Sequence, residues 1–458
     1  MLALGGCASF SEDGGMAPVA SLVSAEIGKE TAKLSNEADA QAVRERISAL
    51  LKQTLTPDAA VQIALLSNRG LQAEFNALGI SEAAFVEASL PPNPTFSFER
   101  ITGGGTLDIE RRIIVNLLAL LTLPVRRDIA ENRFRAAQYK AIEATFRLAA
   151  ETRRAYYRAV ASQQLADYLV QAQLSADAAA DLTRKLGETG ASSKLNQARA
   201  GSFYAEISNQ LARARLAASG EREALTRALG LWAADANYTL PGTLPELPAT
   251  LEKRDHVEAD AIRRRVDLIA ARVELDATAR ALGLTDTTRF VSLLELSGIF
   301  NYERSGGESS RPLGFELAIQ IPLFDFGEVG VRRAREVYMQ SVNRLVEKAV
   351  DIRSEARATY RTFHASYDIA RQYQTNILPL RRVVNEEALL QYNGMLIDVF
   401  ELLTTVRESV ASSIAAIEAR RDFFIAEVDL QTAIIGGGGA AMPRDGTALT
   451  AAPAGGGH

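Results

Sequence analysis

Residues that could perform catalysis or bind a metal are few and scattered in this chain of 458 residues. The three histidines, His256, His364 and His458, lie far apart, and no cysteine or second histidine follows at metal-binding spacing. Carboxylate pairs occur along every predicted long helix without the pattern of a pocket. The glycine run at 436–439 lacks the lysine and the strand-to-helix setting of a phosphate loop. The sequence therefore predicts a protein that is not an enzyme and has no cofactor and no metal site.

The only cysteine, Cys7, has a sequence context that indicates lipidation. It follows Leu4, Gly5 and Gly6 in "MLALGGCASF", which resembles the lipobox of bacterial lipoproteins, where this cysteine becomes the lipidated N-terminus after signal cleavage. Only six residues precede it and none is basic, so the pattern departs from a full signal peptide. Without a second cysteine, an internal disulfide is excluded. We expect Cys7 to be lipidated, and the alternative is an incidental cysteine in a disordered N-terminus.

The composition is compatible with a membrane protein and argues against a nucleic-acid partner. Mean hydropathy is −0.03, and no apolar run of about 18 residues is present to form a membrane-spanning helix. Strands of a membrane barrel alternate in polarity and leave only a weak hydropathy signal. The formal net charge is −5 and no basic tail is present, whereas phosphate-binding proteins usually carry a basic excess.

Two halves of the chain repeat one pattern. The helix-like segment "ALLSNRGLQAEF" from Ala64 matches "AIRRRVDLIAAR" from Ala261, which pairs Leu71 with Leu268. Each segment leads into a strand-like region with a Gly-rich turn at its centre, and a long Ala-rich helix follows. The shared order is therefore helix, β-hairpin, long helix.

Both predicted hairpins, at about 94–123 and about 290–322, alternate in polarity and end in a proline, Pro124 or Pro322. In the first, Phe96 and Phe98 share one face and Thr95, Ser97 and Glu99 share the other. In the second, Phe315, Leu317, Ile319 and Ile321 alternate with Glu316, Ala318 and Gln320. Such strands suit a barrel with lipid on one side and water on the other.

The long helices are expected at about 126–230 and about 328–435, with a break suggested at 186–193. A helix from 126 to 186 would be about 90 Å long. Its apolar residues follow coiled-coil spacing, which a plain helical bundle with a dry core would also show. Four strands cannot close a barrel, so a membrane protein would need several chains to pool their strands. The soluble alternative is a small four-stranded sheet that caps a bundle.

The duplicated plan, together with "LPPNPTFSF", "IPLFDFG" and "YNGMLIDVFELLTTVRE", resembles the TolC-like outer-membrane factors over about residues 56–435. The resemblance implies a mainly α fold with a β membrane part. Three chains would form a twelve-stranded β-barrel, continued by a long periplasmic α-helical barrel. It also implies a passive exit duct, anchored in outer-membrane lipid, of a tripartite efflux or type I secretion system. A periplasmic adaptor protein and an inner-membrane transporter would be its partners.

The resemblance also assigns roles to single residues. Asp398 and Glu401 stand three apart, so both could lie on one face of the last helix. In a trimer, their six carboxylates would form a cation-selective periplasmic aperture. The remaining assignments are strand-to-helix junctions at Pro124, Pro322 and Gly327, and helix-turn tips at Gly187, Gly190, Tyr392 and Gly394. Ordinary solvated carboxylates on the helix surface are the alternative for Asp398 and Glu401.

The predicted organisation has five parts: a lipobox and N-terminal extension (1–55), the first repeat (56–240), a Pro-rich linker (241–250), the second repeat (251–435) and a disordered Gly-rich tail (436–458). The alternative function is a soluble periplasmic coiled-coil adaptor or scaffold. The exported substrate stays open among metals, drugs and polypeptides.

Overall fold

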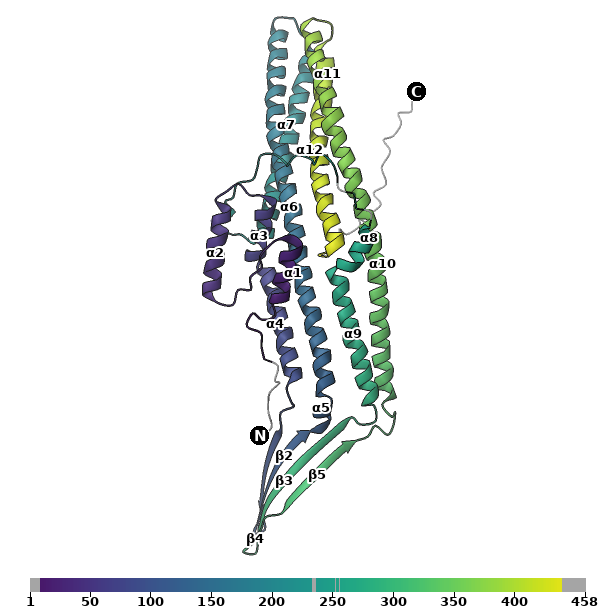
Figure 1. The fold of residues 1–458 in the computed structure, drawn as a ribbon. Coiled ribbons are helices and arrows are strands. Elements are labelled where there is room, and N and C mark those ends of the chain that lie inside the picture. The colour runs from purple at the N-terminus through teal and green to yellow at the C-terminus, as the bar shows by residue number, and fades with distance from the viewer. Residues whose placement is uncertain (1–8, 233–235, 252, 255, 439–458) are drawn as a thin grey trace, which may run out of the picture. The chain divides into compact units, whose positions relative to one another are not determined.

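The structure, a computed structural model, describes residues 9–232, 236–251, 253–254 and 256–438. Cys7, His458 and the tail from 439 lie outside the described residues. Figure 1 shows the elements in chain order: α1 (Ala17–Ile27), α2 (Glu37–Leu51), α3 (Pro57–Ser67), α4 (Arg69–Ser89), β1 (Thr95–Gly103), β2 (Thr106–Asn116), α5 (Leu117–Leu121), α6 (Leu123–Glu188), α7 (Lys194–Leu229), α8 (Val257–Arg264), α9 (Val266–Thr287), β3 (Leu293–Ser305), β4 (Glu308–Ser310), β5 (Leu313–Gln320), α10 (Glu328–Gln372), a π-helical segment (Tyr373–Ile377), α11 (Leu378–Asn393) and α12 (Val399–Ile435).

The chain divides into two compact units, each built from both halves of the sequence. Unit 1 combines Met1–Val43, Asn68–Thr145 and Arg265–Asp351. Unit 2 combines Arg44–Ser67, Phe146–Arg264 and Ile352–His458. Helices α2, α6 and α10 run from one unit into the other. The predicted repeats therefore describe the order of elements along the chain, whereas the compact units join corresponding parts of the two repeats.

The backbone shows the duplication directly. Helix α3 ends and α4 begins at Asn68, where φ is −68° and ψ is 115°. At the matched position of the second half, Arg265 separates α8 from α9 with φ −67° and ψ 113°. Leu71 and Leu268, paired by the sequence match, are both buried. The predicted fold class, mainly α with a β part and a duplicated plan, is confirmed.

The side-chain contacts differ at the two helix breaks, Asn68 and Arg265. The Asn68 amide oxygen accepts a hydrogen bond from the Leu71 N–H at 3.2 Å, which is a helix N-cap. Arg265 has no capping side chain, and its buried guanidinium pairs with Asp267 instead, with 3.0 Å between Nε and Oδ1. The ammonium of Lys348 lies 3.4 Å from the other oxygen of Asp267. A buried carboxylate needs such partners because its desolvation is costly.

The strands form one antiparallel sheet in unit 1. Strand β1 pairs with β2, β2 with β3, and both β4 and β5 with β3. In this order β1 and β5 lie at opposite edges of the sheet, and they run in opposite directions. Arg311 and Pro312 separate β4 from β5, where proline cannot donate a ladder hydrogen bond. The Asn301 N–H nevertheless donates to the Pro312 carbonyl at 3.0 Å and keeps the strands aligned.

The first hairpin is shorter than predicted. Strand β2 ends at Asn116, and the segment expected to continue it to about 123 forms the short helix α5. The Asn116 side chain accepts a hydrogen bond from the Ala119 N–H at 2.8 Å and so caps α5. The sequence "LLALL" that follows favours helix over strand by intrinsic propensity. The second hairpin lies between Leu293 and Gln320, inside its predicted range.

The helices of unit 2 share a core with coiled-coil spacing. Leu169 of α6, Phe203, Ile207 and Leu211 of α7, and Leu403 of α12 are all buried in one cluster. The alanines of this cluster take little space, which lets helices approach closely. The predicted linker at 241–250 packs on this unit through hydrogen bonds. The Leu244 N–H donates to the Gln164 side chain at 3.0 Å, and the Tyr367 hydroxyl donates to the Pro248 carbonyl at 2.9 Å.

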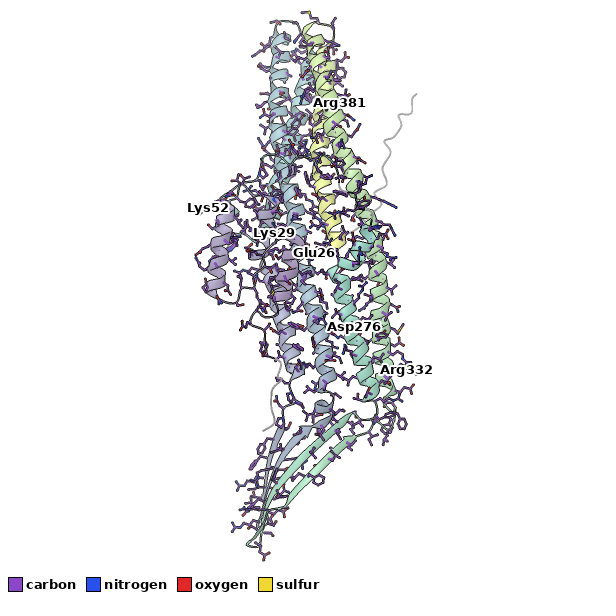
Figure 2. All side chains as sticks on the ribbon, viewed as in Figure 1. Glu26, Lys29, Lys52, Asp276, Arg332 and Arg381 are labelled. Atoms are coloured by element: carbon purple, nitrogen blue, oxygen red, sulfur yellow. The ribbon has the colours of Figure 1, made fainter. Side chains whose placement is uncertain are left out.

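The long helices carry many charged side chains on their surfaces, as Arg332 on α10 and Arg381 on α11 illustrate in Figure 2. The π-helical segment lies directly before Pro379, where the absent N–H would interrupt an ordinary α-helix. In the described part of the chain, no helix combines the length and the apolar character needed to cross a membrane.

Candidate functional site

The second strand-to-helix junction brings Pro322 and Gly327 together in one tight turn. The Phe326 N–H donates to the Pro322 carbonyl at 2.9 Å, and Phe326 has a positive φ of 48°. Gly327 follows with φ 72°, and its N–H donates to the Asp325 carboxylate at 3.1 Å. A Cβ added at Gly327 would lie 2.2 Å from the Arg289 carbonyl oxygen. The turn before α10 therefore requires glycine for both its backbone angle and the space available.

The first junction differs from the predicted one. Pro124 does not end a strand, because α5 and Thr122 separate it from β2. It is the second residue of α6, where proline is favoured since the first N–H groups of a helix have no partner inside it. Asn116, which sequence reasoning missed, marks the end of the strand.

Gly187 and Gly190, both predicted at the first helix-turn tip, occupy different positions there. Gly187 is still helical, at the end of α6, whereas Gly190 has φ 79° in the turn itself. The Leu186 carbonyl accepts hydrogen bonds from the N–H groups of Ala191 at 2.8 Å and Ser192 at 3.1 Å. The Ser193 hydroxyl then caps α7 by accepting from the Asn196 N–H at 3.2 Å.

The second tip places its left-handed residue one position later than glycine. Gly394 has φ −78°, while Met395 has φ 56° and is 93% exposed. The Met395 N–H donates to the Tyr392 carbonyl at 3.0 Å. A methionine in this conformation costs about 1–2 kcal/mol relative to an ordinary backbone. Met395 could not be predicted from residue types, because an Asn-Gly pair normally assigns the positive φ to glycine.

Asp398 and Glu401 lie together at the start of α12, Asp398 directly before the helix and Glu401 in its first turn. Asp398 is the N-cap residue, in extended conformation, and its carboxylate accepts a hydrogen bond from the Glu401 N–H at 2.9 Å. Asp398 therefore precedes the helix, because an aspartate directly before the first turn satisfies the free N–H groups there. Both side chains are exposed.

The start of α12 is held against α7 by charged and aromatic contacts. The Arg199 guanidinium lies over the Phe400 ring, 4.2 Å from its centroid. Two turns further along, the Arg407 and Glu206 side chains approach to 2.9 Å between Nη2 and Oε2. These contacts hold the start of α12, where Asp398 and Glu401 lie, against α7.

The two faces of the sheet of unit 1 differ in their acidic side chains, all of which lie on one face. By the strand register, one face, here called the apolar face, carries most of the large hydrophobic residues, namely Phe96, Phe98, Leu107, Ile109, Ile113, Val115, Leu294, Leu296, Phe300, Leu313, Phe315, Leu317 and Ile319. Ile101, Ile114, Leu293 and Ile299 lie on the opposite face. The opposite, polar face carries every carboxylate of the strands, namely Glu99, Asp108, Glu110, Glu295, Glu303, Glu308 and Glu316. Arg112 on this face pairs with Glu110 at 2.6 Å and with Glu316 at 3.1 Å.

Several solved structures of membrane proteins, outer-membrane channels among them, share the fold of this chain. The outer-membrane channel OprN matches with a TM-score of 0.70 and 17% identity, over 83% of this chain and 90% of its own. The CmeC outer membrane channel of Campylobacter jejuni matches with a TM-score of 0.66 and 16% identity, over 86% of each chain. A membrane protein from Pseudomonas aeruginosa matches with a TM-score of 0.72 and 19% identity, over 82% of this chain and 93% of its own.

The chain has the fold of the TolC-like outer-membrane factors. Neither a scan of protein-family models nor a search of curated proteins found a match. Within the described ranges of this outer-membrane factor fold, no three histidine, cysteine or acidic side chains are grouped so that they could hold a metal ion.

Proposed function

We propose that the chain is a passive exit duct in the outer membrane, and the sheet carries this proposal. Its apolar face is exposed, with Phe315 81% and Leu313 76% accessible, which is the pattern of strands that face lipid. Unpaired strand edges are not tolerated in lipid, so β1 and β5 need further partners. Because β1 and β5 run in opposite directions, β5 of one copy can pair antiparallel with β1 of the next.

Three copies closed in this way give a homotrimer with a twelve-stranded barrel. The polar faces would then line the interior, with seven carboxylates and one arginine from each chain's strands. Such a lining attracts cations and excludes anions. The long helices would continue the wall into the periplasm, as in the channels that share the fold.

The tips of the two helix hairpins would form the periplasmic opening. Asp398 and Glu401 are exposed at one tip, and three copies would place six carboxylates there. Met395 and Leu396 are exposed at the same tip, 93% and 77%, which suits contact with a periplasmic adaptor protein. The adaptor would connect the duct to an inner-membrane transporter of an efflux or type I secretion system.

Fractionation and conductance test this function. We expect the protein to fractionate with outer membranes, to require detergent for release and to conduct ions in a planar bilayer. Release by high salt as a monomer without conductance would contradict the duct, and it would support the soluble periplasmic adaptor instead.

The aperture is tested by removing its charges without removing the helix cap. Asparagine caps helices as well as aspartate does, so Asp398→Asn with Glu401→Gln keeps the local structure. We expect this double variant to lower the cation selectivity of single channels. Unchanged selectivity would assign both carboxylates to the solvated surface.

Two further parts of the proposal have direct tests. Lipidation of Cys7 predicts an acylated N-terminal cysteine in the mass spectrum of the membrane-extracted protein, which Cys7→Ser would abolish. The partner transporter is the protein that co-purifies after cross-linking in cells, and its class would define the exported substrate.

A further inference from the structure

The apolar face of the sheet contains three charges, and all three are arginines. Arg100 of β1, Arg111 of β2 and Arg304 of β3 lie on this face by register. A fourth arginine, Arg311, lies in the connection between β4 and β5. No carboxylate of the strands shares the face.

These arginines gather at one end of the sheet. Arg304 lies opposite Leu107 and Arg100 opposite Ile109, in the two rows of the apolar face nearest the glycine turns at 104–105 and 306–307. Arg111 lies in the next row, opposite Phe98 and Phe300. By chain connection, this is the end away from α4 and α9. The remaining rows of the apolar face, down to Ile319, contain no charge.

The four guanidinium groups are not neutralised within the described residues. None of them forms an ion pair there, whereas Arg112, the neighbour of Arg111 on the polar face, bonds two carboxylates. Arg311 contacts only an aromatic ring, with its guanidinium 5.9 Å from the centroid of Tyr302. Exposed arginines beside large apolar side chains, with the carboxylates of the strands on the opposite face, indicate a site for an external anion.

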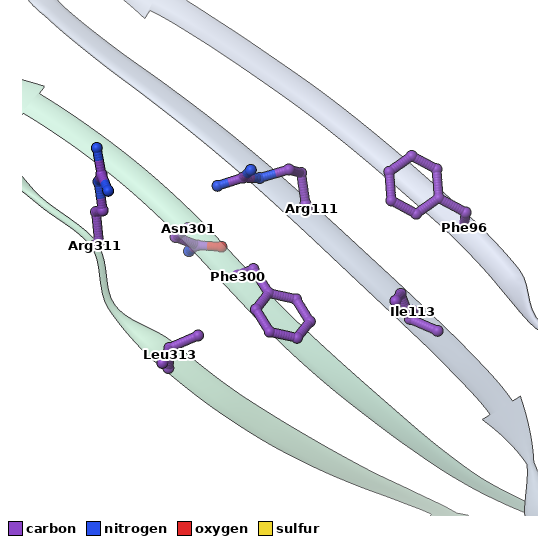
Figure 3. Close-up of a pocket in the computed structure, with 7 residues that line it drawn as sticks. All are labelled: Phe96, Arg111, Ile113, Phe300, Asn301, Arg311 and Leu313. Carbon is purple, nitrogen blue, oxygen red and sulfur yellow. The ribbon is translucent and has the colours of Figure 1, made fainter. Parts of the chain in front are cut away.

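Shallow pockets connect the arginines to the apolar surface. Arg111 and Arg311 line one pocket together with Phe96, Phe300 and Leu313 (Figure 3). The same two arginines line a second pocket beside Phe98 and Tyr302. A ligand that fits both features has an anionic head and apolar chains.

We propose that this arginine cluster binds anionic, phosphate-bearing lipid headgroups. The inference rests on the proposed membrane insertion. The uncharged rows, from Phe315 to Ile319 on β5, span about 13 Å of strand and belong to the apolar band of the proposed membrane barrel. The arginines thus lie at the border of that band, at the level of headgroups, and guanidinium groups bind phosphate with two parallel hydrogen bonds. Tyr302 and Phe98 lie where aromatic residues favour the interface.

Lipid titration of the purified full chain tests the proposal. The protein in nonionic detergent would be titrated with lipid A, phosphatidylglycerol and phosphatidylcholine, and bound lipid counted by native mass spectrometry. Each arginine at an anionic surface contributes about fivefold in affinity, so Arg111→Gln with Arg304→Gln should weaken lipid A and phosphatidylglycerol binding by about thirtyfold. Arg112→Gln, on the neighbouring position and opposite face, should leave lipid binding unchanged.

The outcomes separate this inference from the proposed duct. Equal lipid binding by the double variant and the native chain would overturn the inference, even if both conduct ions in a bilayer. Displacement of lipid A by millimolar inorganic phosphate alone would identify a free-phosphate site and overturn the lipid assignment. Failure to conduct would contradict the duct itself, whatever lipid binds.

Discussion

Gly327 occupies a backbone conformation and a space that a side chain cannot share. We expect Gly327→Ala to lower the free energy of unfolding by about 2 kcal/mol or more, because φ is 72° and the new Cβ would meet the Arg289 carbonyl. Gly330, three residues later inside α10, is the matched control. Its Cβ would contact Thr285 Cγ2 at an ordinary 3.7 Å, so Gly330→Ala should stabilise by about 0.5–1 kcal/mol. Thermal unfolding followed by circular dichroism measures both, and equal effects would contradict the account.

Tyr156 makes a buried hydrogen bond that also couples stability to pH. Its hydroxyl donates to the Leu55 carbonyl at 3.0 Å, so Tyr156→Phe should cost about 1–2 kcal/mol in denaturant unfolding. Burial raises its pKa from 10.0 to about 12, and burial does the same for Tyr157. The stabilising contribution is complete below pH 10 and is lost between pH 10 and 12, because only the unfolded tyrosines ionise there. Tyr156→Phe should reduce this alkaline loss, and an unchanged pH dependence would contradict the assignment.

Residue types were enough to predict the residues of the second junction, but not the tip residue Met395 or the arginine cluster. Pro322 and Gly327 were predicted because proline and glycine have few other uses between a strand and a helix. Met395 was missed because its positive φ depends on the closing of the whole tip. The arginine cluster was missed because only pairing with a partner strand shows that Arg111 and Arg304 share a face.

At the scale of elements, the alternation of the strands is the feature with the most consequences. Leu317 and Ala318 are neighbours on β5 that point to opposite faces. We expect Leu317→Lys to cost about 2–4 kcal/mol of membrane stability and to reduce the amount assembled in the outer membrane. Ala318→Lys would place its charge opposite Glu295 on the polar face and should assemble normally. Similar assembly of both variants would show that the apolar face does not meet lipid.

The alternation of apolar and polar residues also explains which strands and strand ends could be predicted from the sequence. The period of two identified all four long strands, since each has one apolar and one polar face. It could not find the end of β2, because the apolar "LLALL" fits either state and the Asn116 cap decides for helix. The π-helical segment before Pro379 could not be predicted from the proline, because the local change from α-helix to π-helix depends on the surrounding helix.

In the whole molecule, the two repeats follow the order of the chain, whereas the two compact units are defined by contacts between distant segments. The repeats were predicted from matched segments along the chain, and the matching backbone at Asn68 and Arg265 confirms them. The two units could not be predicted, because each joins three segments that are separated along the chain by segments of the other unit. The trimer followed only from the resemblance and from the rule that strand edges must be covered in lipid.

Disulfide cross-linking between strand edges tests most directly whether three chains close into one ring. In one chain, β2 and β3 separate β1 from β5 by about 14 Å, which is beyond the reach of a disulfide. In a Cys7→Ser background, cysteines at Ser97 of β1 and at Glu316 or Ala318 of β5 can therefore link only different copies. We expect oxidised outer membranes to yield covalent species of one, two and three chains and none larger. Monomers alone, or a ladder that continues beyond three chains, would contradict the account.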